Sequence, residues 1–187
     1  DAGPTGKGPW QVVYRVALDG SEESTVLIGS LHQAGAAKSG LNDPQGIDTD
    51  SAGNIYVADY GNNRVAVFRP DGTYLDEIPV PFPDGLHVSK KTGAVYVMQL
   101  QQRQKPFDDQ HYYTPAHNWR ADRVDKFRSL DDTAELAAFV NTLKSNYGGG
   151  AHVTVYESGD VPIHWLTGLK YGGGPVFRIA ARGDSLD

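Results

Sequence analysis

The chain has 187 residues, of which 39% are hydrophobic, and this is enough for one domain with a substantial core. Its 17 basic and 23 acidic residues give a net charge of −6 without any basic run, which argues against a nucleic-acid partner. The absence of cysteine excludes disulfides and thiolate metal sites, and no apolar run of about 18 residues is present to form a membrane span.

The acidic start, Asp1-Ala2-Gly3-Pro4, carries no signal peptide. Such a start fits a chain from which a signal peptide has been cleaved. It fits equally well a sequence boundary that arose in another way. We expect a secreted or periplasmic protein. The 22 glycines and 11 prolines predict many turns, and therefore many short strands.

The first unit, about residues 10–35, is predicted to contain two strands. Trp10–Leu18 is followed by the turn residues Asp19-Gly20, and Ser24–Leu31 supplies the second strand. The first run aligns with Asn62–Pro70, which is followed by Asp71-Gly72. This unit is therefore predicted to hold only the outer two strands of a four-stranded sheet.

The second unit, about residues 41–80, is predicted to be a complete four-stranded antiparallel meander. Turn residues at SAGN, YGNN and DG separate short β-branched and aromatic runs. The four predicted strands are Gly46–Asp50, Asn54–Asp59, Arg64–Phe68 and Tyr74–Ile78.

Residues 44–78 carry the pattern P-x-G-I-x-x-D…G-N-I-Y-V-A-D-x-G-N-N-R-V-x-V-F…D-G. This pattern resembles an NHL repeat, the blade unit of a family of β-propellers. The resemblance implies an all-β chain whose four-stranded sheets are propeller blades. Strands within each blade are then numbered first to fourth from the propeller axis outward.

The third unit, about residues 83–140, repeats the pattern with an insertion. Pro83–Val88, Gly93–Met98 and Arg123–Phe127 are predicted as its first three strands, and Ala134–Val140 as the fourth. Between the second and third strands, Leu100–Ala121 replaces a four-residue turn. This insertion is the largest departure from the repeat.

The last unit, about residues 150–187, is predicted to have three strands: His152–Tyr156, Val161–Leu166 and Pro175–Ala180. The strand counts of two, four, four and three do not close a ring, because joining the first and last units would duplicate a third strand. We therefore expect residues 1–187 to be one propeller domain of about three to four blade units, forming a section of a six-bladed propeller. The alternative is a compact four-bladed protein with one irregular blade.

Candidate functional residues gather on one predicted face of the propeller. Strands alternate in direction, so the insertion and the turn that precedes Pro83 both reach that face. His87 occupies the first-strand position held by Asp48 and Thr154 in the neighbouring units. The other polar and aromatic candidates there are Asp108, Asp109, His111, Tyr112, Tyr113, His117, Trp119, His164 and Trp165.

Some of these residues suit a divalent metal. Imidazoles with a carboxylate can bind zinc, copper or iron, and the candidate ligands are His87, His111, His117, His164 and Asp48. Carboxylates at Asp48 and Asp50 can alternatively hold calcium. The spacing of His111 and His117 matches no helix-based metal motif. The alternative interpretation is that His87 and His164 are hydrogen-bonded strand residues, His111 and His117 lie in solvent, and the two aspartates satisfy strand amides.

Asp59, Asn62, Asn63 and Arg64 have a structural interpretation. They lie at the turn between the second and third strands of the blade. The Asp and Asn side chains are expected to cap backbone amides there, and Arg64 is expected to bridge neighbouring strands.

Two functions of different classes are consistent with these residues. The first is a protein-interaction or assembly module, which contacts a protein partner or blades of another chain through the face with the 100–121 insertion. Its expected binding residues are Tyr112, Tyr113, Trp119 and Trp165, because aromatic side chains provide large contact areas.

The alternative is a metal-dependent lyase or hydrolase. The NHL resemblance extends to peptidyl-α-hydroxyglycine α-amidating lyases, which implies zinc at His87 and His164 and proton transfer by Tyr112 or Tyr113. In that family a histidine follows the blade-opening proline, whereas this chain has Gln45 and Asp84 at those positions. We therefore favour the non-enzymatic function.

Overall fold

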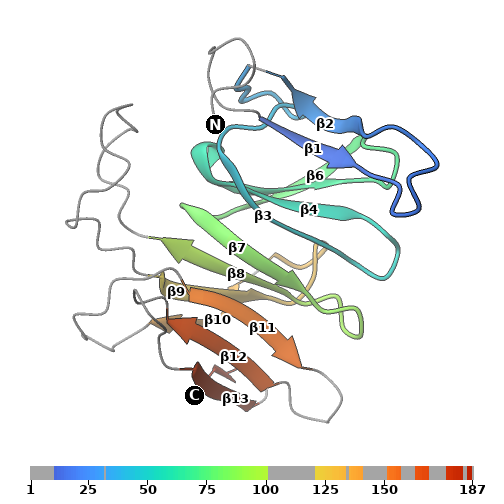
Figure 1. Ribbon diagram of the computed structural model, residues 1–187. Coiled ribbons are helices and arrows are strands. Elements are labelled where there is room, and N and C mark those ends of the chain that lie inside the picture. The colour runs from blue at the N-terminus through green and yellow to red at the C-terminus, as the bar shows by residue number, and fades with distance from the viewer. Residues whose placement is uncertain are drawn as a thin grey trace. The chain divides into compact units, whose positions relative to one another are not determined.

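The computed structural model describes residues 11–31, 33–100, 121–133, 135–140, 151–156, 163–168, 176–182 and 185–186. In these residues the chain is all-β, with one short 3₁₀ helix, η1 (Tyr60–Asn62) (Figure 1). No helix in this part of the chain is long and apolar enough to cross a membrane. The strands are β1 (Gln11–Arg15), β2 (Thr25–Ser30), β3 (Pro44–Thr49), β4 (Ile55–Asp59), β5 (Arg64–Phe68), β6 (Tyr74–Pro79), β7 (Pro83–Val88), β8 (Val95–Leu100), β9 (Ala121–Phe127), β10 (Glu135–Val140), β11 (Ala151–Tyr156), β12 (Ile163–Gly168), β13 (Val176–Arg182) and β14 (Ser185–Leu186).

The strands form four sheets in sequence order. β1 and β2 form a pair, and β3–β6, β7–β10 and β11–β14 each form a four-stranded meander. This arrangement confirms the predicted all-β fold made of propeller-type blades. The chain divides into two compact units, Asp1–Asp84 and Gly85–Asp187.

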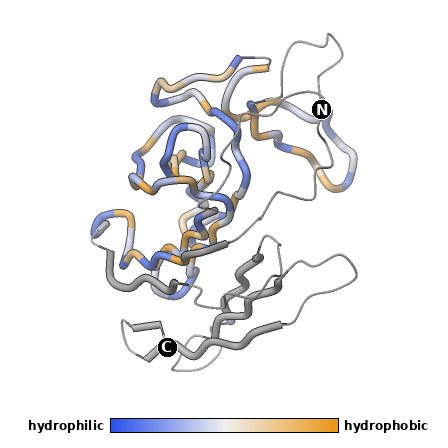
Figure 2. Tube along the Cα trace, turned by 90° about the vertical axis from the view of Figure 1, so that its left-hand side faces the viewer, coloured by the Kyte–Doolittle hydropathy of each residue, from blue (hydrophilic) through white to orange (hydrophobic). Residues whose placement is uncertain are grey.

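Sheet β3–β6 is organised around its two central strands. Every residue of β4 and β5 is buried, because both strands have neighbours in the sheet and apolar side chains pointing to both faces. The pairs Ile55↔Phe68 and Asp59↔Arg64 mark the two ends of their register. Apolar and polar residues follow one another at short intervals along the described chain (Figure 2).

The β1–β2 connection, residues 16–24, contains the same kind of Asp side-chain contact as the shorter β5–β6 connection, residues 69–73. The Oδ1 atom of Asp19 accepts from the amide of Ser21 at 3.0 Å, and that of Asp71 accepts from the amide of Thr73 at 2.9 Å. These two turns are the Asp-Gly positions that the sequence alignment matched. The assignment of β1 and β2 as the third and fourth strands of a blade unit stays a prediction.

The core of the compact unit Asp1–Asp84 lies between the sheets β1–β2 and β3–β6. One face of β1–β2 packs on one face of β3–β6, as expected for adjacent blades. The buried cluster consists of Ile28, Leu41, Ile55, Val57, Ala66 and Phe68, with Val13, Leu27 and Tyr74 packed against it.

In the compact unit Gly85–Asp187, the predicted insertion joins two neighbouring strands of one sheet. β8 ends at Leu100 and β9 begins at Ala121, and these two residues are paired. Residues 101–120 lie outside the described part of the chain. The paired strands on either side retain the blade register, with Gln99 opposite Arg123 as Asp59 is opposite Arg64.

The prediction of only three strands in the last unit was wrong. β14, of two residues, pairs with the end of β13 through Ala181↔Leu186 and Arg182↔Ser185. A two-residue strand is too short to show alternation in the sequence. Within the described residues, the sheets therefore contain two, four, four and four strands. The six-bladed ring and the single domain remain predictions.

Candidate functional site

A polar network lies at the turn between β4 and β5. Asp59 ends β4, Arg64 begins β5, and the short η1 turn brings Asn62 between them. The Oδ2 atom of Asp59 accepts from Arg64 Nε at 2.8 Å and from Asn62 Nδ2 at 2.8 Å. Its Oδ1 atom accepts from the amide of Asn42 at 2.7 Å. The fully buried carboxylate therefore receives three donors.

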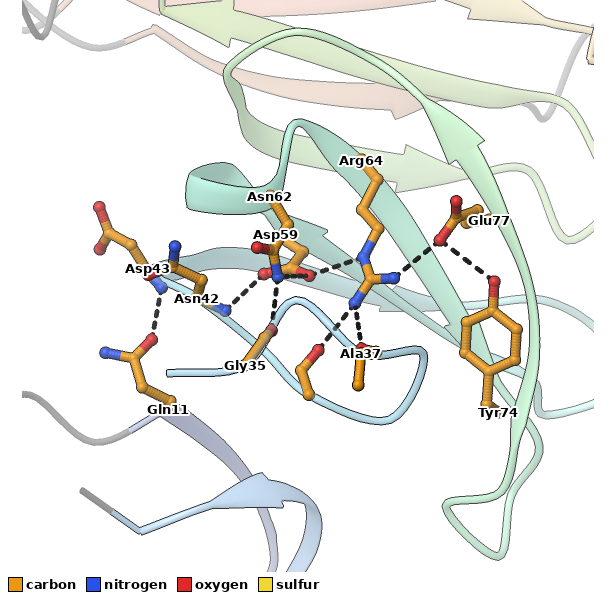
Figure 3. Close-up of polar contacts among 11 residues, drawn as sticks. Gln11, Gly35, Ala37, Asn42, Asp43, Asp59, Asn62, Arg64, Tyr74 and Glu77 are labelled. Carbon is orange, nitrogen blue, oxygen red and sulfur yellow. Dashed lines mark hydrogen bonds and ion pairs between the residues drawn. The ribbon is translucent and has the colours of Figure 1, made fainter. Parts of the chain in front are cut away.

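Arg64 extends this network to a neighbouring strand and a loop (Figure 3). Its Nη1 atom lies 2.7 Å from Glu77 Oε2 on β6. Its Nη2 atom donates to the carbonyls of Ala37 at 3.0 Å and Gly40 at 2.8 Å. Asn62 Nδ2 also donates to the carbonyl of Gly35 at 2.8 Å. Loop 33–42, which leads into β3, is thus held against the turn.

The charges in this network shift each other's pKa. Burial works to lower the pKa of Arg64, but its hydrogen bonds to Asp59 and Glu77 outweigh burial and raise that pKa. The pKa of Glu77 is lowered, mainly by the hydrogen bond from Arg64 and further by the one from Tyr74. The pKa of Tyr74 is raised, first by burial and then by its hydrogen bond to Glu77. All three groups keep their usual charge states at neutral pH.

Asn63 connects this turn to the start of β7. Its backbone is left-handed, with φ of 54°, and its carbonyl accepts from the amide of Val80 at 3.1 Å. Its Oδ1 atom accepts from the amide of Phe82 at 3.0 Å. The predicted structural roles of Asp59, Asn63 and Arg64 are confirmed. Asn62 differs, because its side chain donates to oxygen atoms instead of capping an amide.

Two of the predicted metal ligands have described side chains. His87 is half-buried on β7, and its ring lies 6.3 Å from that of Tyr96, centroid to centroid. Asp48, on β3, accepts from the amide of Thr49 at 2.7 Å, which is the amide role weighed in the sequence. Among the side chains that the structure describes, no group of three His, Asp or Glu residues could hold a metal ion.

The remaining predicted site residues lie where side chains are not described. His164 and Trp165 belong to β12, and Trp165 pairs with Thr154 through the backbone. The insertion residues fall outside the described part of the chain; these are Asp108, Asp109, His111, Tyr112, Tyr113, His117 and Trp119. The proposed metal and binding sites therefore stay predictions.

The sequence reasoning overlooked a buried polar pair in sheet β7–β10. Gln99 Nε2 donates to Asp125 Oδ2, and both side chains are buried, as is that of Lys126. Asp125 occupies the position that Ala66 holds in the preceding sheet, and Gln99 that of Asp59. The sequence signal that could have revealed this pair is Asp125 itself, a charged residue where the preceding repeat has the apolar Ala66.

Comparison with known families identifies one repeat. The family model described as the NHL repeat matches residues 41–68. The resemblance seen in the sequence is therefore confirmed for this part of the chain. A search of curated proteins finds no match.

Solved structures also show similarity. A streptogramin B lyase is 15% identical with a TM-score of 0.45, and the match covers 85% of this chain and 45% of the lyase. The virginiamycin B lyase from Staphylococcus aureus, in selenomethionine-substituted form, is 14% identical with a TM-score of 0.40, and the match covers 75% of this chain and 42% of the lyase. This chain therefore spans less than half of either structure.

Proposed function

We propose that the chain is a protein-interaction module of NHL-type blades, which binds a protein partner through the 100–121 insertion. The supporting observation is the register of β8 and β9. Gln99 pairs with Arg123 as Asp59 pairs with Arg64, although four residues separate the second pair and 23 separate the first. The sheet thus does not need the additional residues in order to close.

The composition of the insertion suits protein recognition. Its segment FDDQHYYTPAHNW combines aromatic, acidic and imidazole side chains. Tyrosine and tryptophan provide large contact areas at low entropic cost, and both are enriched at interfaces. Tyr112, Tyr113 and Trp119 are the proposed contact residues, with Trp165 of β12 beside them on the same predicted face. By contrast, the Asp59–Arg64 network is occupied with internal contacts.

Site-specific photo-crosslinking tests this proposal. A photoreactive amino acid replaces Tyr112 in one variant and Lys90, an exposed residue of the β7–β8 turn, in the matched control. In an extract of the source cells, we expect one protein to crosslink at Tyr112 and not at Lys90. Equal crosslinking at both positions, or none at Tyr112, would contradict the proposal.

The enzyme alternative predicts a different result. A metal-dependent lyase should carry about one equivalent of zinc, measurable by inductively coupled plasma mass spectrometry of the purified chain. That metal should be lost in His87→Ala and His164→Ala variants. Such a result, without partner crosslinking, would replace the interaction module by the enzyme.

A further inference from the structure

The sequence contains three Asp-Gly dipeptides, whose backbone can rearrange without an enzyme. They are Asp19-Gly20, Asp71-Gly72 and Asp84-Gly85. In such a dipeptide the glycine nitrogen can attack the γ-carbon of the aspartate, because glycine has no Cβ to obstruct the approach. The attack requires the backbone to leave its folded conformation, so a backbone that is held firmly reacts slowly. The three dipeptides should therefore differ according to how the fold holds each of them.

Asp19-Gly20 lies in an exposed connection between β1 and β2. Residues 18–26 are all exposed, and a Cβ built on Gly20 would meet nothing within 4 Å. Two local contacts hold the dipeptide: the amide of Gly20 donates to the carbonyl of Ala17 at 3.1 Å, and Asp19 Oδ1 accepts from the amide of Ser21 at 3.0 Å. Both contacts join residues of the same loop. The dipeptide can therefore change conformation without displacing a strand.

Asp71-Gly72 lies in the tighter turn between β5 and β6. The amide of Arg69 donates to the carbonyl of Thr73 at 2.8 Å, and the amide of Gly72 donates to the carbonyl of Arg69 at 2.9 Å. A Cβ built on Gly72 would lie 2.4 Å from the carbonyl oxygen of Leu27 on β2. This dipeptide is therefore held both by its own turn and by a second sheet.

Asp84-Gly85 belongs to strand β7, which pairs with β8. Both residues are half-buried, and a Cβ built on Gly85 would lie 3.2 Å from Met98 Cε. Regular sheet pairing keeps the backbone extended, so this dipeptide can rearrange only when the strand detaches.

The acidity of the two turn aspartates does not decide between them. The pKa of Asp19 is lowered, first by a hydrogen bond from the side chain of Ser21. The pKa of Asp71 is also lowered, first by the hydrogen bond from the amide of Thr73. The attack needs the uncharged carboxyl group, so both shifts slow the reaction. The freedom of the backbone is what separates the two positions.

We propose that Asp19 is a spontaneous modification site, at which the folded chain forms isoaspartate before either of its other Asp-Gly dipeptides does. The Gly20 nitrogen bonds to Asp19 Cγ, and the carboxyl hydroxyl leaves as water together with the amide proton. The product is a cyclic succinimide. Water then adds to the backbone carbonyl of Asp19 and breaks its bond to the Gly20 nitrogen. The chain now runs through Cγ, and a free carboxylate remains on the α-carbon.

The modified site has a recognisable chemistry. The side-chain carboxylate that accepts from the amide of Ser21 becomes a backbone carbonyl, and the connection gains one backbone carbon. The exposed residues 18–26 leave room for this change. The new α-carboxylate is the group that protein isoaspartyl methyltransferases methylate, so a repair enzyme of this class is the partner that fits. This inference depends on neither the 100–121 insertion nor its proposed partner.

Ageing of the full chain tests the proposal. The purified protein is kept in neutral buffer for several weeks, and its peptides are analysed by electron-transfer fragmentation, which distinguishes aspartate from isoaspartate. We expect isoaspartate to form at position 19 about tenfold faster or more than at positions 71 and 84, because those two require a packed turn or a sheet to open. In a parallel sample unfolded in urea, the three rates should converge, since the reacting dipeptide is the same.

Two variants assign the signal to its position. Asp19→Glu keeps the charge, but its longer side chain would have to close a larger ring, which is much slower. Aged Asp19→Glu should therefore lose most of the methyl groups that a protein isoaspartyl methyltransferase transfers from radiolabelled S-adenosylmethionine to aged wild type. Asp71→Glu is the matched control and should retain nearly all of them.

Four results would overturn the inference. They are equal rates at positions 19 and 71 in the folded chain, a faster rate at position 84, a preference for position 19 that is as large in urea as in the folded chain, and no isoaspartate at position 19 after ageing.

Discussion

Arg64 donates to four acceptors on three segments: Asp59 at the end of β4, Glu77 on β6, and two carbonyls of loop 33–42. A guanidinium suits this position because its donors are fixed in one plane and point in several directions. The same contacts leave Asp59 dependent on Arg64, since the carboxylate is wholly buried. Removing the guanidinium should therefore destabilise the folded protein more than the loss of its partly exposed contact with Glu77 alone would.

We predict that Arg64→Ala lowers the free energy of unfolding by about 3 kcal/mol, because it leaves a buried carboxylate without its countercharge. Arg64→Lys should recover only part of this loss, since lysine cannot bond both Asp59 and Glu77 with the same geometry. Urea denaturation measures the free energy of unfolding of both variants. Arg69→Ala, at an exposed position on the same segment, is the control and should change stability by less than about 0.5 kcal/mol. A similar loss for Arg64→Ala and Arg69→Ala would contradict the prediction.

Glu77 makes the network sensitive to acid. Its folded-state pKa lies below the ordinary value of 4.5, so its ionisation favours the folded state above that pH. This stabilisation should be complete at neutral pH and should disappear as the pH falls through the lowered pKa. Because Glu77 is partly exposed, the effect should be small. Urea denaturation of wild type and Glu77→Gln should give curves that differ at pH 7 and approach each other below pH 4.5. A difference that grows toward acid would show the opposite linkage.

At the scale of elements, the turns are as important as the strands. Gly72 has φ of 85°, and a Cβ there would lie 2.4 Å from the carbonyl oxygen of Leu27 on β2. Gly20, at the matching turn, has φ of 70°, but a Cβ there would meet nothing within 4 Å. The two glycines share a backbone conformation, and only Gly72 also contacts the facing sheet.

Alanine at these two positions separates backbone strain from packing. Gly20→Ala should lower the free energy of unfolding by about 1 kcal/mol, the cost of a left-handed alanine. Gly72→Ala should cost about 3 kcal/mol, because the β1–β2 sheet must also shift. Thermal and urea unfolding compare the two variants. Equal losses would indicate that β1–β2 does not rest on this turn.

Sequence reasoning succeeded where local signals specify an element. Arg64–Phe68 was predicted with the observed bounds of β5, because alternating residues lie between two turn signals. The reach of Arg64 to Ala37 and Gly40 could not be predicted, since it depends on the path of a loop without periodicity. β14 was missed because a two-residue strand is defined only by its partner. The candidate site was predicted as a set of residues, and only Asp48 and His87 among its proposed metal ligands have described side chains.

At the scale of the first unit, stability should be uneven. β4 and β5 are buried along their whole length, whereas β1 has a single described neighbour and ends in exposed residues. We predict that amides of β4 and β5 exchange only through global unfolding and that amides of β1 exchange by local opening. Hydrogen exchange with mass spectrometry at several urea concentrations distinguishes global unfolding from local opening. Equal, urea-dependent exchange in β1 and β5 would show that the unit opens as a whole.

The link from Asn63 to Val80 and Phe82 has a consequence for how such a chain can evolve. Val80 and Phe82 take part in this link through their backbone amides, which every residue except proline provides. A duplicated blade can therefore follow this link whatever side chains it carries at positions 80 and 82, provided that Asn63 is kept. Growth of the gene in whole blades, with the asparagine retained in each copy, is a history that this junction permits.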